Sequence, residues 1–189
     1  MPDFPKYAGE ADYEGLVLKA DEYLAIGRTH ARYELVDGRV LRLPSPTLHR
    51  QVALMELSLQ LGRWERANRG SLAIHSIDVR LNDRLVYCPE AVVYGPGRFP
   101  RLPNRLHTPP DLVIEFYWGD TGKEDRARRI RDFDAFGVRE YWAFEDVTKV
   151  RAWALRPGTP ERVVEKGLIA SVVPGLTVNL DEVLKVLSE

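Results

Sequence analysis

The segment PPDLVIEFYWGD, residues 109–120, places a carboxylate near the middle of an apolar and aromatic run. Two prolines precede the run and a glycine ends it, which is the boundary pattern of a short buried strand. A carboxylate in such a strand costs several kcal/mol unless it has a cationic partner, a proton or a metal ion. Glu115 therefore indicates either a functional site or a structural ion pair.

A second acid interrupts the preceding apolar segment, since Glu90 follows Pro89 directly within residues 85–94. Alternate residues of a strand share a face, so Glu115 faces the same way as Asp111 and Val113. Neighbouring strands that aim Glu90 and Glu115 at one point would form a site for Mg²⁺ or Mn²⁺, which prefer oxygen ligands. The alternative is an arginine partner for each acid. Asp111, directly after two prolines, is expected at the strand edge, in water.

Composition limits the class of protein. The chain has 189 residues, the size of one domain, and a net charge of −1, which excludes a generally cationic surface for nucleic acid. The sequence contains no apolar run of about 18 residues, so no membrane span is expected. The single cysteine, Cys88, excludes an internal disulfide and a cysteine-rich zinc site, and a cytoplasmic location is expected. Basic residues are mostly arginine, 21 against 6 lysines.

The order of elements predicts a mixed α/β fold. A mobile tail is expected over residues 1–15 and a single domain over 16–189. Within the domain, patterns of period 3.6 and period 2 predict the following elements: helix 16–26, hairpin 32–43 turning at Asp37-Gly38, helix 46–68, strands 72–81 and 85–94, loop 95–110, strand 111–117, helix 123–136, strands 138–146 and 150–157, an edge strand within 161–167, and helix 181–188. The strand–helix–strand unit over 111–146 predicts some parallel pairing.

Helix 46–68 is the longest of these elements, and its apolar residues suggest which side faces the core. The expected inner stripe is Val52, Met55, Leu59 and Trp64. The complete architecture is then a mixed central β-sheet flanked by helices on both faces.

Five segments in this order resemble a known family. They are YELVDG at 33–38, PSPTLHRQV at 44–52, Pro89-Glu90, PPDLVIE at 109–115 and EDRARRIRDFDAFGVREYW at 124–142. Together with VVPGL at 172–176 they resemble the landmarks of the Uma2 family, also called DUF820, of restriction-endonuclease-like proteins. The resemblance covers about residues 16–185 and implies a PD-(D/E)xK nuclease fold with a Mg²⁺-dependent phosphodiesterase site.

The resemblance also implies a set of site residues. Glu90 matches the acid that follows a proline, and Glu115 matches the second acid; both are expected as metal ligands, for Mg²⁺ or Mn²⁺. Arg129 matches the position at which the family carries a lysine on the following helix. Glu34 and His49 fall on further landmarks, with Glu34 as an added catalytic acid or a partner of Arg129. DNA is the implied substrate and a homodimer the expected assembly, through helix 46–68 or the aromatic strand 138–144.

Three positions depart from the family pattern. Glu90 stands in place of an aspartate, Trp118 in place of a serine, and Arg129 in place of a lysine. Arginine stabilises charge but does not act as a base, because it does not lose its proton in proteins. Two hypotheses therefore stand side by side, a metal-dependent DNA endonuclease and a catalytically silent nucleic-acid-binding module of the same fold. An unrelated two-carboxylate hydrolase is a third and weaker interpretation.

Nucleic-acid contacts are expected mainly from the loop at 95–110. Its arginines, Arg98, Arg101 and Arg105, have no acid between them, so they are candidates for phosphate contact. On helix 123–136, Arg126 is a further candidate, although a solvated face explains most of the charges there. His49 is a candidate contact as well, with a capping or packing role as its simpler explanation.

Overall fold

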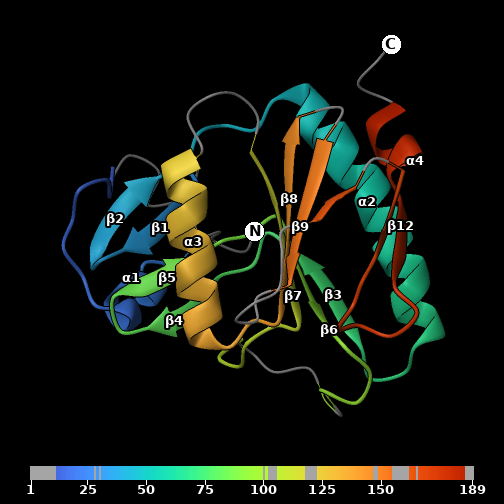
Figure 1. The fold of residues 1–189 in the computed structure, drawn as a ribbon. Helices are drawn as coiled ribbons and strands as arrows, with labels where there is room; N and C mark the ends of the chain where they lie inside the picture. The colour runs from blue at the N-terminus through green and yellow to red at the C-terminus, as the bar shows by residue number, and fades with distance from the viewer. Residues whose placement is uncertain are drawn as a thin grey trace, which may run out of the picture.

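The computed structural model describes residues 12–27, 29, 31–99, 101, 106–117, 123–146, 149–154, 162–164 and 166–185. In this part of the chain a six-stranded sheet and a four-stranded sheet lie side by side, with helices covering the larger sheet (Figure 1). The fold class is the mixed α/β one that the order of elements predicts.

The six-stranded sheet has the order β10-β9-β8-β7-β6-β3. Its strands are β3 (Leu72–His75), β6 (Ala91–Tyr94), β7 (Leu112–Phe116), β8 (Glu140–Asp146), β9 (Lys149–Ala154) and β10 (Arg162–Val164). The β7–β8 pair is parallel and is connected by α3 (Lys123–Phe136), whereas the other pairs are antiparallel. The predicted parallel unit and the edge strand within residues 161–167 are both confirmed.

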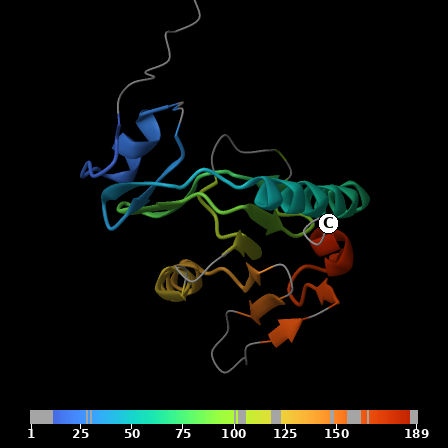
Figure 2. The same cartoon turned by 90° about the horizontal axis from the view of Figure 1, so that it is seen from above.

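Helices cover both faces of this sheet (Figure 2). On one face, α2 (Leu48–Ala67) and α4 (Leu180–Lys185) pack with Leu112, Ile114 and Phe116 of β7. On the other face, Phe133 of α3 packs with Val113 of β7 and with residues of the four-stranded sheet. The alternation along β7 follows the prediction, but both of its faces are core. Glu115, which shares a face with Val113, is therefore covered by α3, in agreement with its expected burial.

The four-stranded sheet has the order β2-β1-β5-β4. Its strands are β1 (Tyr33–Val36), β2 (Arg39–Arg42), β4 (Val79–Asn82) and β5 (Leu85–Tyr87), and α1 (Ala20–Ala25) packs beside β1. The β1–β2 hairpin turns at Asp37 and Gly38, whose φ angles of 52° and 79° are those of a type I′ turn. Glu34 of β1 accepts hydrogen bonds from the Cys88 backbone N–H and from Arg129 of α3, each at 2.6 Å.

Two predicted strands are each divided between the sheets. Residues 72–81 form β3 and β4, separated at Ser76, which has a positive φ of 49°. Residues 85–94 form β5 and β6, separated by Cys88, Pro89 and Glu90. The prediction of two continuous strands was wrong, because at both places the chain passes from one sheet to the other. Glu90 therefore lies at the junction of the two sheets.

The inner face of α2 differs from the predicted one. Trp64 is buried as expected, but Met55 and Leu59 are 60% and 48% exposed. The core-facing residues are instead Ala53, Leu57, Leu61 and Trp64. The apolar residues of α2 lie on several sides of the helix, so periodicity alone does not identify the buried face. Packing against β12 and α4 determines which side is buried. Contact between two copies through the exposed side of α2 stays a prediction.

The remaining segments complete the domain. A two-stranded sheet of β11 (Gly167–Ile169) and β12 (Thr177–Asn179) precedes α4 and was not predicted. Residues 1–11 of the expected tail lie outside the described residues, whereas Gly15 donates a backbone hydrogen bond to Val40 at 2.8 Å. Tyr141, Trp142 and Phe144 of β8 are fully buried, so this aromatic strand offers no surface to a second copy. No described helix is long and apolar enough to span a membrane.

Candidate active site

Glu90 and Glu115 meet where β6 and β7 pair. The strands are antiparallel with Ala91 opposite Ile114, so the residue before β6 lies near the end of β7. The Glu90 Oε2 atom accepts a hydrogen bond from the Phe116 backbone N–H at 3.1 Å. Both side chains are buried, with exposed fractions of 4% for Glu90 and 3% for Glu115. Burial raises the pKa of Glu90, and the nearby charge of Glu115 raises it further against the opposing effect of Arg50.

Arg129 connects the two sheets through a buried ion-pair network. It projects from α3 and donates from Nε to Glu115 Oε1 at 2.8 Å and to Oε2 at 2.9 Å. Its Nη1 and Nη2 atoms donate to Glu34 at 2.6 and 3.0 Å, and Nη2 also contacts Glu115 Oε1. The guanidinium lies over the Tyr87 ring at 4.0 Å. One buried cation therefore serves two carboxylates, on β1 and β7.

Two tyrosines complete the surroundings of Glu115. The hydroxyls of Tyr117 and Tyr141 both donate to Glu115 Oε2, and they lie 2.6 Å from each other. Burial and the Glu115 charge raise the pKa of both phenols well above the ordinary value, so they remain neutral donors. Tyr117, two residues after Glu115, therefore hydrogen-bonds to this acid together with Tyr141 of β8.

Arg50 pairs with Glu90 from the start of α2. The helix begins after Thr47, whose side chain accepts a hydrogen bond from the Arg50 backbone N–H at 3.3 Å. The Arg50 Nη2 atom contacts Glu90 Oε1, and its side chain is 23% exposed. Arg50 is next to His49 in sequence, but the spacing did not indicate it as a partner of Glu90. His49 itself is exposed on the first turn of α2.

This arrangement does not fit a divalent ion held between Glu90 and Glu115. An ionised carboxylate has about four acceptor positions on its two oxygens. At Glu115 four hydrogen-bond donors lie within reach: Nε and Nη2 of Arg129 and the hydroxyls of Tyr117 and Tyr141. A metal ion would have to displace the buried guanidinium of Arg129. No group of three or more metal-binding side chains is found among the described residues.

The nuclease resemblance is supported by comparison with known proteins. A family model, "Uma2: Putative restriction endonuclease", matches residues 20–184. The chain belongs to the Uma2 family. The crystal structure of a putative nuclease of DUF820 from Anabaena variabilis matches with a TM-score of 0.76 and 19% sequence identity. The alignment covers 90% of this chain and 99% of that one, which shows a shared fold. None of the curated proteins compared with this chain matches it.

The Uma2 landmarks divide between buried and exposed positions. Glu34, Glu90, Glu115 and Arg129 are brought together in the interior.

Of the proposed nucleic-acid contacts, Arg105 lies outside the described residues and Arg101 is exposed. Arg98 donates to the Pro109 carbonyl oxygen at 2.8 Å, and Arg126 forms an ion pair with Glu145 and is 16% exposed. Arg126 is therefore a weaker candidate for phosphate contact than its place on a charged helix indicated.

Asp111 corrects a prediction. It was expected at a strand edge in water, but its exposed fraction is 2%. Its Oδ2 atom accepts a hydrogen bond from the Gly95 N–H at 2.7 Å, and Oδ1 pairs with Arg139 at 2.5 Å. The loop that follows β6 covers Asp111, which sequence periodicity does not indicate. Asp111 stabilises the β6–β7 connection and does not belong to the acid cluster.

The raised pKa of Glu90 predicts a pH dependence of stability. The Glu90 carboxyl binds its proton more tightly in the folded protein than in the unfolded chain. Glu90 therefore lowers the free energy of unfolding least below its unfolded pKa of about 4.3, where the group is protonated in both states. Stability is lost as the pH rises from there through the raised folded pKa. Glu90→Gln is neutral throughout, so its melting temperature should rise relative to wild type as the pH increases above the unfolded pKa of about 4.3.

Thermal unfolding followed by circular dichroism at several pH values measures this difference. Glu124→Gln, at an exposed position in α3, is the matched control and should follow the wild-type curve. Parallel curves for wild type and Glu90→Gln would contradict the proposed cost of ionising Glu90.

Proposed function

We propose that this protein binds DNA through a restriction-endonuclease-like fold and does not cut it with a metal ion held by Glu90 and Glu115. The nuclease family to which the chain belongs implies a nucleic-acid substrate. The proposed absence of metal-dependent cleavage is supported by the hydrogen bonds at Glu115. The acceptor positions of this carboxylate are occupied by donors from Arg129, Tyr117 and Tyr141. Lysine at position 129 would offer a single ammonium instead of a five-donor planar fork. Arg129 thus forms a structural ion pair with Glu34 and Glu115 at the position where the family carries a lysine.

A metal-dependent DNA endonuclease, with Mg²⁺ or Mn²⁺, is the second candidate. It is favoured by Glu90, whose two oxygens each accept one described hydrogen bond and so keep acceptor capacity. Its partner Arg50 is partly exposed and can turn toward solvent. Mg²⁺ is commonly held by one or two carboxylates together with water and substrate phosphate. This candidate still requires Arg129 to leave Glu115.

A plasmid assay separates the two candidates. Wild-type protein is incubated with supercoiled DNA and Mg²⁺ or Mn²⁺, and DNA retention is measured separately with EDTA. We expect retention without metal and no nicking. Nicking by wild type that Glu115→Gln abolishes would refute the proposal and establish the endonuclease.

Arg129→Lys should change this result. Lysine frees acceptor positions on Glu115, so we expect metal-dependent nicking to appear in this variant while DNA retention stays unchanged. Arg131→Lys, at an exposed position in the same helix, is the matched control and should remain inactive. Nicking by both variants would point to a contaminating nuclease and would remove Arg129 as the cause.

A further inference from the structure

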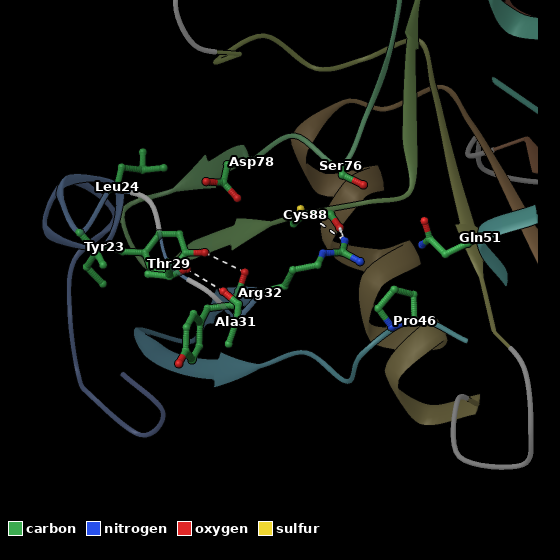
Figure 3. A pocket seen from close by; sticks show the side chains of 13 residues that line it. Tyr23, Leu24, Thr29, Ala31, Arg32, Pro46, Gln51, Ser76, Asp78 and Cys88 are labelled. Carbon is green, nitrogen blue, oxygen red and sulfur yellow. Dashed lines mark hydrogen bonds between the residues drawn. The ribbon is translucent and has the colours of Figure 1, made fainter. Parts of the chain in front are cut away.

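A cavity of about 450 Å³ lies beside the acid cluster, between α1, the start of α2 and the junction of the two sheets (Figure 3). We name it the Arg32 pocket. One part of its wall is apolar and includes Tyr23, Leu24 and Ile26. Polar side chains, among them Gln51 and Asp78, line the remainder. Small-molecule sites have volumes of roughly 300–1,000 Å³, so the pocket is of the size for one small ligand.

Arg32 places a positive charge in this pocket. Its side chain extends toward Pro46 and Gln51 (Figure 3). The Nη2 atom donates to the Cys88 carbonyl oxygen at 3.3 Å and approaches Cys88 Sγ at 3.6 Å. Arginine has five N–H donors, and these contacts use one nitrogen. No carboxylate lies within ion-pair distance of Arg32 among the described residues, whereas Arg50 and Arg129 are both paired.

The pocket adjoins the acid cluster through three shared segments. Cys88 precedes Glu90 by two residues, and Gln51 follows Arg50 directly. The Ser76 backbone N–H donates to the Glu90 carbonyl oxygen at 3.1 Å. A ligand on Arg32 would therefore lie next to the residues that correspond to the nuclease site of the family.

We infer that the Arg32 pocket holds one nucleotide of a DNA strand, with its phosphate on Arg32 and its base against the Tyr23 wall. A nucleobase combines flat apolar faces with polar edges, which suits a wall of aromatic and aliphatic groups facing the amide side chain of Gln51. A stacked and paired duplex is too wide to enter. The ligand is thus an unpaired nucleotide, either in a single strand or extruded from a duplex. This inference rests on the proposed function for the choice of a nucleotide over another anion.

The test is DNA binding in EDTA at 0.15 M salt, measured by fluorescence anisotropy. The probes are a labelled single-stranded 12-mer, a fully paired duplex and a duplex with one unpaired nucleotide. We expect Arg32→Gln to weaken binding of the single strand about tenfold, the loss expected for a charge-assisted hydrogen bond. Arg32→Lys keeps the charge and should retain most of the affinity. Melting temperatures of both variants show whether they fold.

Arg63→Gln is the matched control, because it removes the same charge from the exposed side of α2. It lies 12 residues beyond Gln51, about 18 Å along the helix, and should change affinity by less than about twofold. Equal effects of Arg32→Gln and Arg63→Gln would overturn the inference. So would equal Arg32 dependence for the fully paired duplex and the single strand.

Two further comparisons identify the ligand. If the nucleotide comes from a single strand, the 12-mer binds more tightly than the duplex with one unpaired position; the reverse order indicates extrusion. Deoxynucleoside monophosphate should compete at lower concentration than inorganic phosphate, and equal competition would refute a role for the base. Absence of DNA binding by wild type refutes the proposed function. DNA binding that Arg32→Gln leaves unchanged refutes the pocket inference alone.

Discussion

Arg129→Met should lower the free energy of unfolding by about 3–5 kcal/mol, the loss found when one partner of a buried ion pair is removed. Methionine fills similar volume but leaves the carboxylates of Glu34 and Glu115 without their cation. Because both acids are buried, water does not replace the lost hydrogen bonds at low cost. Urea unfolding monitored by tryptophan fluorescence measures the change.

Two further variants test the reason for that loss. Arg131→Met removes an exposed arginine from the same helix and should change stability by less than about 0.5 kcal/mol. The double variant Arg129→Met with Glu115→Gln should recover part of the loss, because it also removes one uncompensated charge. A double variant less stable than Arg129→Met alone would show that Glu115 does not depend on the guanidinium.

Glu140→Ala should cost about 3 kcal/mol, because the buried indole N–H of Trp142 is left without a partner and three further hydrogen bonds are lost. Glu140 is buried at the start of β8, and its Oε2 atom accepts from the backbone N–H groups of Ser171 at 2.7 Å and Val172 at 3.1 Å. The Ser171 hydroxyl donates to the same oxygen at 2.9 Å, and Trp142 Nε1 donates to Oε1 at 2.9 Å. One carboxylate therefore attaches the segment before β12 to the central sheet.

Hydrogen exchange distinguishes this role from a general loss of stability. In Glu140→Ala, amides of residues 167–179 should exchange faster than those of β7, since the attachment of the C-terminal segment is lost locally. Glu140→Gln keeps one acceptor oxygen and should lose about half as much. Uniform acceleration across β7 and β12 would contradict a local attachment.

Local patterns in the sequence predict those features that depend on neighbours along the chain. The Asp37-Gly38 turn, the helix at 123–136 and the face shared by Val113 and Glu115 follow from turn preference and periodicity. The parallel β7–β8 pair follows from the connecting helix. These features need no knowledge of distant residues.

Partners of the site residues depend on the tertiary structure. Glu34 and Arg129 are 95 residues apart in sequence, and periodicity does not show that they meet. A metal ligand and an arginine partner look the same in a single sequence, because in both cases Glu115 is a lone acid in an apolar strand. The same applies to Tyr141, which reaches Glu115 from β8.

Tertiary structure also decides which side of each element is inside. Helix α2 has apolar residues on several of its sides, and its contacts with β12 and α4 place Leu57 and Leu61 in the core. Asp111 is buried by a loop that begins 16 residues earlier in the chain. The amino-acid sequence by itself determined most of the helices and strands, their order and the presence of Glu90 and Glu115 in apolar segments, because these follow from short-range conformational preferences. Apart from the pairing of Glu34 with Arg129, which the family resemblance implied as one option, only the packed structure decided what neutralises those acids, because burial and charge pairing depend on which distant segments come to lie against them.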